Sequence, residues 1–175
     1  ILDALADQTD YNVIFAPHVR LFSGRPVAAT PEIRPYADLA HMHLDLGETN
    51  RAVDMTYTRA ADIYLGDVSS QVYEFLRRPK PCLFLNAHGA AWRGDESYRH
   101  WRYGPVLDSP DDLVEQISRA RFTHGAYRAE QADGFTQTYD LSGASSSARA
   151  AEAIASLLNS TAADLNSTVG RAAGL

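Results

Sequence analysis

Two adjacent serines lie where a short apolar run ends and a helical pattern begins, within residues 64–75, YLGDVSSQVYEF. At the start of a helix the backbone N–H groups are unpaired and the helix dipole attracts anions, so Ser69 and Ser70 could hold a phosphate. Gly66 would let the backbone approach that ligand closely, and Asp67 would support the turn. A serine that only caps the helix produces the same pattern and is very common. The spacing alone slightly favours the cap.

His18 and Arg93 are two further candidates for binding an anionic ligand. His18 follows an apolar run, and a histidine in that place can contact a phosphate or act as a general acid. A surface histidine in a loop explains the position more simply. Arg93 lies in residues 92–103, which interleave aromatic residues with arginines and so suit stacking on a nucleobase and pairing with phosphate oxygens. Packing against a partner lobe favours the same residue types.

A third pattern, His41-Met-His43-Leu-Asp45, would place two imidazoles and a carboxylate on one face of a strand. Its spacing resembles the H-x-H-x-D-H run of metallo-hydrolases. Leu46 stands in place of the closing histidine and no second group of ligands is evident, so we predict no metal site. Cys82 lies within an apolar run and is most simply a core residue.

Short apolar runs alternate with helical patterns along the chain, and these elements would position the candidate residues. We predict strands at 11–16, 41–46, 62–65, 81–85 and 106–107, and helices at 1–8, 53–60, 69–77, from 109 through 120, and 146–159. Long loops are predicted at 21–35 and 88–103. This alternation is typical of an α/β fold with a Rossmann-like, doubly wound parallel sheet and helices on both faces.

The carboxyl ends of parallel strands meet at one edge of a sheet, where ligands bind in folds of this class. Polar residues follow each of the first four predicted strands: His18, residues 47–49, residues 67–70 and residues 86–89. We therefore expect the binding site at this edge. We assign residues 1–160 to one Rossmann-like domain and residues 161–175, which lack a clear apolar stripe, to a polar C-terminal tail.

Composition and charge narrow the classes of function. The apolar content of 45% and the charged content of 22% are those of a soluble globular domain, and the single cysteine suits a reducing compartment. No apolar run approaches the roughly 20 residues that cross a bilayer. The net charge of −6 argues against a nucleic-acid binder. Residues 76–105 hold six basic and two acidic residues, a local net charge of +4 that suits a small anionic ligand.

Four stretches, in the same order, resemble the C-terminal part of the CDP-glycerol glycerophosphotransferase family, the teichoic-acid type polymerases and primases. The segment AADIYLGDVSSQVYEFLRRPKPCLFL is the most specific, because the family has an aspartate and paired serines before a helix and a Lys-Pro strand after it. IFAPHVRLF resembles the family's strand with a Pro-His element, AWRGDESY its Arg-Gly element, and YDLSGASSSARAAEAI its closing helix. The likeness covers roughly residues 11–158.

This resemblance implies the donor-binding lobe of a GT-B architecture, which holds a nucleotide diphosphate-linked sugar or polyol for transfer to a hydroxyl acceptor. By the same resemblance, Ser69 and Ser70 would contact the donor's phosphates, Asp67 would shape their turn, and Arg93 would be a cationic partner. His18 would lie near the pyrophosphate and is the one candidate catalytic residue. No metal or other cofactor is implied.

The resemblance also implies that an N-terminal lobe of the same protein carries the base for the acceptor hydroxyl. The opening Ile1-Leu-Asp-Ala-Leu has no initiator methionine, so we expect a longer protein. We expect it in the cytoplasm, with any association with the inner face of the membrane made through regions outside this chain. Two alternatives stay open: a nucleotide-sugar 2-epimerase-like GT-B enzyme, and a non-catalytic Rossmann-like module that binds a nucleotide or a partner.

Overall fold

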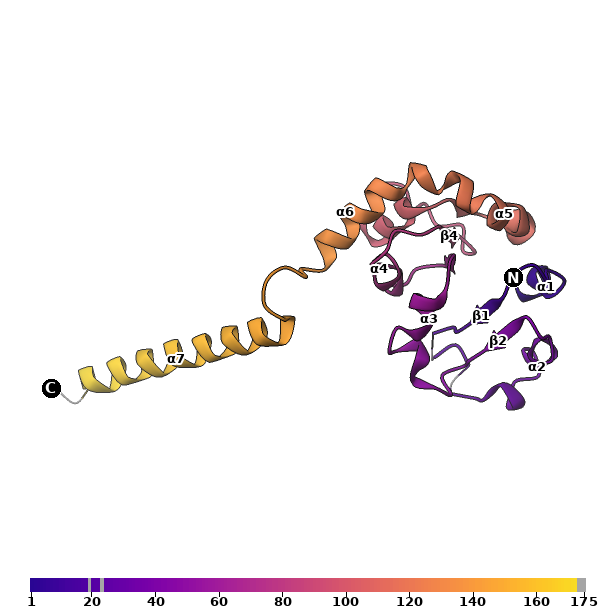
Figure 1. Cartoon of the computed structure of the whole chain (residues 1–175). Coiled ribbons are helices and arrows are strands. Elements are labelled where there is room, and N and C mark those ends of the chain that lie inside the picture. The colour runs from indigo at the N-terminus through magenta and orange to yellow at the C-terminus, as the bar shows by residue number, and fades with distance from the viewer. Residues whose placement is uncertain (19, 23, 173–175) are drawn as a thin grey trace. The chain divides into compact units, whose positions relative to one another are not determined.

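The computed structural model describes residues 1–18, 20–22 and 24–172 of the chain (Figure 1). The chain divides into two compact units, Ile1–Phe135 and Thr136–Leu175. All strands found in the described residues belong to the first unit. The candidate residues also lie in the first unit, so its fold decides how they are placed.

Five parallel strands form the framework of the first unit, and they lie where the apolar runs predicted them. The strands β1 (Val13–Phe15) and β2 (Met42–Leu44) pair in parallel as one sheet. The strands β3 (Tyr64–Gly66), β4 (Cys82–Leu85) and β5 (Val106–Leu107) form a second parallel sheet in that order. A parallel α/β fold is therefore confirmed.

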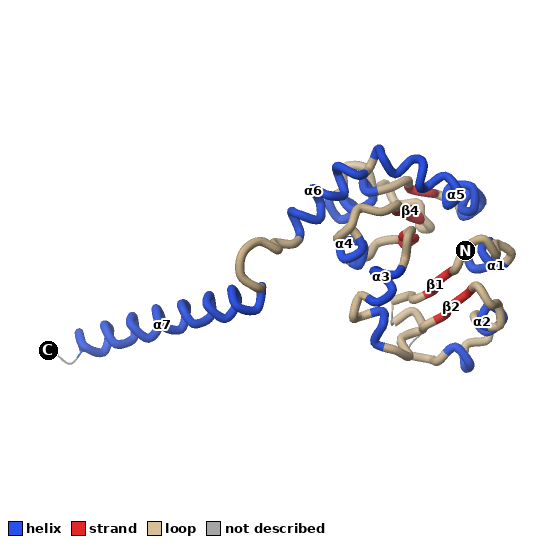
Figure 2. Tube along the Cα trace, in the orientation of Figure 1, coloured by secondary structure: helices blue, strands red, loops and turns tan. Residues whose placement is uncertain are grey.

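The division into two sheets differs from the single sheet that the sequence predicted. The strands are two to four residues long, so each forms only a few ladder hydrogen bonds. Over the described part of the chain, β1 pairs with β2 alone and β3 pairs with β4 alone. Long connections separate the short strands, as the tan tube of Figure 2 shows. Side-chain packing, rather than a continuous ladder, joins the two halves of the framework.

Helices cover both faces of the three-stranded sheet. Every residue of the central strand β4 is buried, and its side chains alternate between the faces. Leu83 packs with Leu113 and Ile117 of α5 (Leu113–Thr123) on one face. On the other face, the ring of Phe84 lies 6.2 Å from that of Tyr64 and 5.8 Å from that of His100.

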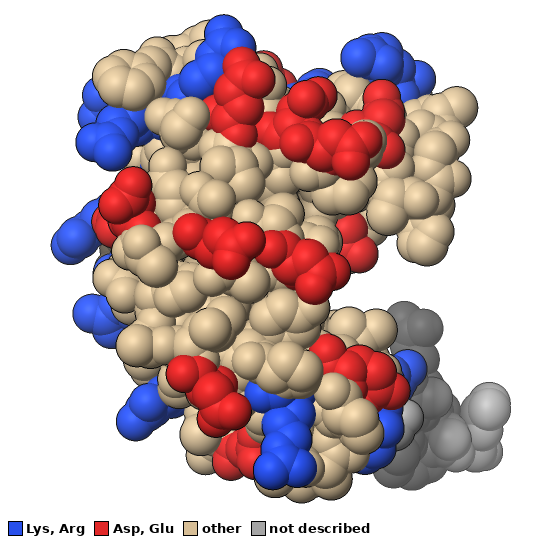
Figure 3. Space-filling view, turned by 90° about the vertical axis from the view of Figure 1, so that its right-hand side faces the viewer, with Lys and Arg blue, Asp and Glu red and all other residues tan. Residues whose placement is uncertain are grey.

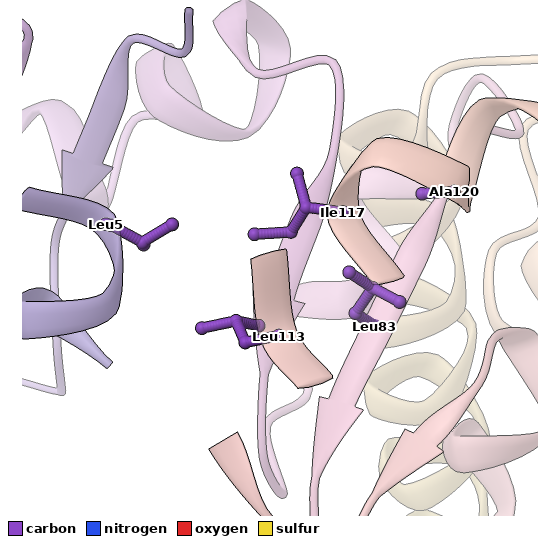
Figure 4. Close-up of a cluster of buried hydrophobic side chains, with 5 residues drawn as sticks. All are labelled: Leu5, Leu83, Leu113, Ile117 and Ala120. Carbon is purple, nitrogen blue, oxygen red and sulfur yellow. The ribbon is translucent and has the colours of Figure 1, made fainter. Parts of the chain in front are cut away.

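One hydrophobic cluster joins the two sheets. Its buried members come from α1 (Leu2–Ala6), β4 and α5, and partly buried residues of β1, β3 and β5 pack against them. Figure 4 shows how the side chains converge from opposite sides: Leu5, Leu83, Leu113, Ile117 and Ala120. Burying a leucine or isoleucine side chain contributes about 1.5–3 kcal/mol, so this cluster is a main source of the unit's stability.

The remaining helices of the first unit are short, and several match the predicted patterns. They include α2 (Arg34–Ala37), α3 (Thr56–Ala60), α4 (Gln71–Phe75) and 3₁₀ segments at Val27–Ala29, Asn50–Ala52, Glu96–Tyr103, Pro110–Asp112 and His124–Ala126. The predicted start at residue 109 is confirmed, because the side chain of Ser109 accepts a hydrogen bond from the N–H of Asp111. The predicted loops 21–35 and 88–103 both contain helical turns.

The helix α6 (Arg128–Thr138) was not predicted, because its buried positions are Gln131 and Gly134 rather than large apolar residues. Gln131 is fully buried, and its amide nitrogen donates to the carbonyls of Lys80 at 3.0 Å and Tyr103 at 2.7 Å. Its amide oxygen lies 2.8 Å from Nε2 of His124. A single side chain therefore ties α6 to the start of β4 and to the segment before β5.

The second unit consists mainly of α7 (Ser146–Ala172), which continues beyond the predicted end at 159. Leu141, Ile154, Leu157 and Leu158 are exposed. Across the described residues, no helix combines the length and the apolar character needed to cross a bilayer. The last three residues of the predicted tail, 173–175, lie outside the described residues.

Candidate functional site

Most of the candidate residues gather at the carboxyl edge of the three-stranded sheet, which we call the rim. Residues 67–70 follow β3, Asn86 follows β4 and Asp108 follows β5. Because the three strands are parallel and adjacent, these loops lie side by side. The rim therefore combines carboxylate, amide and hydroxyl groups with the loop that carries Arg93.

Ser69 and Ser70 differ in what their side chains do. The hydroxyl of Ser69 accepts a hydrogen bond of 3.3 Å from the N–H of Gln71, whereas Ser70 makes no side-chain cap bond. The Ser69 hydroxyl therefore supports the turn that leads into α4, whose N-cap residue is Ser70. This helix has only five residues, so its dipole is much weaker than that of a longer helix. Ser70 is exposed and is the freer of the two hydroxyls for a ligand.

Gly66 makes room for a side chain of its own strand. A Cβ atom at this position would lie 2.6 Å from the hydroxyl oxygen of Tyr64. Burial raises the pKa of Tyr64 to about 12, so the phenol stays neutral at physiological pH. The absence of a side chain at Gly66 thus serves the packing of Tyr64, where the sequence had predicted close approach of a ligand.

The turn after β3 is held by two side chains that the sequence did not indicate for this role. The indole N–H of Trp101 donates a hydrogen bond of 2.9 Å to the carbonyl of Asp67, and Nε2 of His100 lies 3.3 Å from the same oxygen. A carbonyl only accepts, so Nε2 of His100 carries a hydrogen. Burial lowers the pKa of His100, which favours the neutral ring. The aromatic stretch was a visible signal, but the two roles considered for it from the sequence were ligand binding and packing against a partner lobe.

A cavity of about 480 Å³ opens at the rim beside Asn86, Trp92, Arg93 and Asp108, and we call it the rim cavity. Asn86 is buried, and its amide nitrogen donates to Asp108 at 2.8 Å and to the carbonyl of Ala90 at 3.2 Å. Its amide oxygen accepts from the N–H of Ala90 at 2.8 Å. Asn86 therefore shapes the cavity, while Asp108 and Arg93 present charge to it.

Among the described residues, Arg93 is the one basic residue that lines the rim cavity, and its guanidinium lies 4.6 Å from the ring centroid of Trp92. The basic stretch of the sequence is not one patch, because β4 divides it. Arg77, Arg78 and Lys80 precede β4 and lie toward the amino edge of the sheet. The ammonium of Lys80 donates to the carbonyls of Thr58 and Ala61.

The other two arginines of the stretch already have partners. Nε of Arg99 donates to the hydroxyl of Tyr73 at 3.0 Å, and Nε of Arg102 lies 3.8 Å from a carboxylate oxygen of Glu130. These contacts hold the Glu96–Tyr103 segment against α4 and α6. Tertiary contacts thus reduce the positive charge that faces the rim cavity to a single guanidinium.

His18 follows β1 and so belongs to the other sheet. Its side chain is exposed, and Nδ1 accepts a hydrogen bond of 3.2 Å from the N–H of Arg20. Among the described residues, no interaction links His18 to Ser69, Ser70 or Arg93. Asp67, Ser69 and Ser70 thus follow β3 and Arg93 lies in the loop after β4, at the same edge of the sheet, but the rim cavity is lined by Arg93 and not by the serines or Asp67. His18 lies after β1, in the other sheet.

The His41–Asp45 pattern is used for internal hydrogen bonds. Nε2 of His41 lies 3.2 Å from the carbonyl of Leu5, and Nε2 of His43 lies 2.8 Å from the hydroxyl of Tyr57. Tyr57 in turn donates to Asp45 at 2.7 Å. Over the described residues, no three His, Cys, Asp or Glu side chains lie close enough to hold a metal ion.

Charge is unevenly distributed over the first unit. Figure 3 shows the face that carries α1 and α5, where the carboxylates form bands and most basic side chains lie at the margins. The exposed acids of α1 and of the start of α5 include Asp3, Asp7, Asp111, Asp112 and Glu115. This face would repel an anionic ligand.

Comparison with protein-family models, with curated proteins and with solved structures gave no match to this chain. The resemblance to the glycerophosphotransferases therefore stays a prediction from the sequence. The proposed function depends on the geometry of the rim.

Proposed function

We propose that this chain is the donor-binding lobe of a glycosyl- or glycerophosphotransferase-like enzyme. It would bind a nucleotide diphosphate-linked sugar or polyol, similar to CDP-glycerol, for transfer to a hydroxyl acceptor. The rim cavity of about 480 Å³, with Arg93 and Asp108 on its wall, is the observation that supports this proposal best. Its size is within the range of small-molecule sites.

The charges around the rim cavity match the chemistry of such a donor. Asn86 occupies only one oxygen of Asp108 at 2.8 Å, so the carboxylate keeps capacity to accept hydrogen bonds from ribose or polyol hydroxyls. Arg93 would pair with a phosphate through its planar guanidinium. The exposed hydroxyl of Ser70, on the neighbouring loop, would add a donor.

Transfer of this kind requires that charge on the departing nucleotide be stabilised, and positioned donors do so effectively. Arg93 is the residue we assign to that role. The base that activates the acceptor hydroxyl would come from an N-terminal lobe of the same protein. Such a reaction belongs in the cytoplasm, where nucleotide conjugates are used.

Isothermal titration calorimetry of the full chain with CDP-glycerol, UDP-glucose and GDP-mannose tests the proposal. We expect one of them to bind with micromolar to millimolar affinity and Arg93→Ala to weaken it about tenfold or more, as for loss of a charge-assisted hydrogen bond. Arg78→Ala, which removes the same charge toward the opposite edge of the sheet, is the matched control. The proposal fails if no conjugate binds, or if both variants weaken binding equally.

A further inference from the structure

The helix α7 carries a row of exposed apolar side chains, which we call the α7 row. Its members Ile154, Leu157 and Leu158 are 60%, 67% and 64% exposed, although proteins usually bury leucine and isoleucine. The helix has 27 residues, so it extends for about 40 Å at 1.5 Å per residue. A helix gains most of its stability from packing of its apolar face, so the α7 row calls for a partner.

The sequence of α7 repeats with a period of seven residues. Leu-Asn-Ser-Thr occurs at residues 158–161 and again at 165–168, across the point where the sequence had predicted a polar tail to begin. An α-helix has 3.6 residues per turn, so a seven-residue repeat stays on one contact line when two helices wind around each other. The period therefore indicates that the partner of the α7 row is a second helix with the same repeat.

We propose that α7 pairs with α7 of a second copy of this chain, parallel and in register, as a two-stranded coiled coil. This inference does not depend on the proposed function. The repeat places Leu158 at the a position of a heptad and Ile154 and Thr161 at d. In a parallel pair each position faces its own copy, so leucine would pack against leucine. In an antiparallel pair a faces d, and Leu158 would then face Ile154 or a threonine.

The polar side of α7 lies opposite the α7 row. Over residues 149–160, the polar and charged residues all fall at the b, c and f positions of the heptad, which face the solvent in a coiled coil: Arg149, Glu152, Ser156, Asn159 and Ser160. Over the same residues, the a, d, e and g positions hold no charged residue. Two copies would therefore meet along this stretch without repulsion between like charges.

The hydrogen bonds of α7 leave the α7 row uncovered. The hydroxyl of Thr161 donates a bond of 2.9 Å to the carbonyl of Leu157 in its own helix, so it needs no partner when the d position is buried. The guanidinium of Arg149 donates to the carbonyls of Ala144 at 2.9 Å and Asp140 at 2.7 Å. These bonds hold the preceding loop at the f side of the helix, away from a and d.

Sedimentation equilibrium of the full chain over a wide range of concentrations tests the proposal. We expect a particle of twice the 19.2 kDa of one chain. Leu158→Asp should weaken the association about a hundredfold or more, because a leucine is lost from the interface of both copies. Ser156→Asp adds the same charge on the opposite side of α7, so this matched control should leave the dissociation constant unchanged.

A second variant covers the case in which the aspartate disrupts the helix. Leu158→Ala removes the apolar side chain but keeps the helix, because alanine is the best helix former. It should weaken the association about tenfold or more. Circular dichroism of the two variants and the natural chain checks that the helix content of Leu158→Ala is retained.

Crosslinking tests the parallel register. Cysteines at the same d position of a parallel pair come within the roughly 4.4–6.8 Å between Cα atoms that a disulfide spans. Thr161→Cys should therefore form a disulfide-linked dimer on mild oxidation, whereas Ser156→Cys, on the opposite side of α7, should not. The natural Cys82 is buried and does not compete.

A natural chain that stays monomeric, or a dimer that Leu158→Asp leaves intact, overturns the inference. A monomer in which Leu158→Asp lowers the urea midpoint of the first unit also overturns it, because α7 would then pack against its own chain. A dimer in which Thr161→Cys does not crosslink overturns the parallel register.

Discussion

The indole N–H of Trp101 donates a hydrogen bond of 2.9 Å to the carbonyl oxygen of Asp67, which lies 34 residues earlier in the chain. Through this bond the aromatic segment before β5 supports the turn that carries Ser69 and Ser70. The same indole lines a second cavity, of about 400 Å³, together with Trp92 and Tyr127. The side chain of Trp101 therefore supports the rim and also forms part of the wall of the second cavity.

Replacing Trp101 by Phe should destabilise the protein by about 2–4 kcal/mol. The change removes the closer of the two donors to the carbonyl of Asp67 and leaves a small void where the larger ring was buried. Urea unfolding followed by circular dichroism measures the loss. Trp92→Phe is the control, because Trp92 is half-buried, and it should cost less than about 1 kcal/mol. Equal losses in the two variants would mean that the bond to Asp67 contributes little.

Ser69 and Ser70 should contribute unequally to the stability of the protein. Ser69→Ala removes the acceptor for the N–H of Gln71 and should cost about 1 kcal/mol, the usual value for a hydroxyl that accepts a backbone hydrogen bond at a helix start. Ser70→Ala removes an exposed hydroxyl without a cap bond and should cost less than about 0.5 kcal/mol. Denaturant unfolding of both variants checks this. If Ser70→Ala were the more destabilising change, the hydrogen bond at the helix start would be wrongly assigned to Ser69.

Acid should destabilise the protein through Asp45. Burial would raise the pKa of Asp45, but hydrogen bonds from Thr49 and Tyr57 and from the N–H groups of Gly47 and Thr49 outweigh burial and lower this pKa to about 2. A carboxylate whose pKa is lower in the folded state contributes stability that is complete above the unfolded value, 3.8, and is lost as the pH falls toward 2. We expect this loss to be about 2 kcal/mol.

Urea unfolding of Asp45→Asn at pH 6 and pH 2.5 measures this contribution. The variant should be less stable than the natural chain at pH 6, and the difference should shrink at pH 2.5. Tyr57→Phe removes one of the donors to Asp45 and should give an intermediate dependence on pH. A difference between natural chain and Asp45→Asn that stays constant with pH would exclude the carboxylate as the cause.

Gln131→Ala should destabilise the protein by about 2–4 kcal/mol, because it removes the donor to the carbonyls of Lys80 and Tyr103 and leaves a cavity. Gln116→Ala in α5, where the side chain is only partly buried, is the matched control and should stay within about 1 kcal/mol of the natural chain. Thermal unfolding of both variants tests the difference. A Gln131→Ala protein as stable as its control would show that α6 is held by other contacts.

Local patterns were enough to predict where the five strands lie and that they run parallel. Apolar runs bounded by turn residues identify β1 to β5, and alternation with helical patterns implies parallel pairing. The side-chain bonds that Ser69 and Ser109 make at the start of their helices were also visible, since each bond spans only two residues. The rim followed from the same information, because it requires only that the strands be parallel.

Tertiary structure alone decided how these elements are combined. The separation of β1 and β2 from the other strands places His18 after a strand of one sheet, and Ser70 and Arg93 after strands of the other. The burial of Gln131 holds α6 in place, and the bond from Trp101 to Asp67 makes the later part of the aromatic stretch a support for the turn after β3. Each of these features depends on contacts between residues that are far apart in the chain. Periodicity and spacing describe only near neighbours, so they cannot specify such contacts.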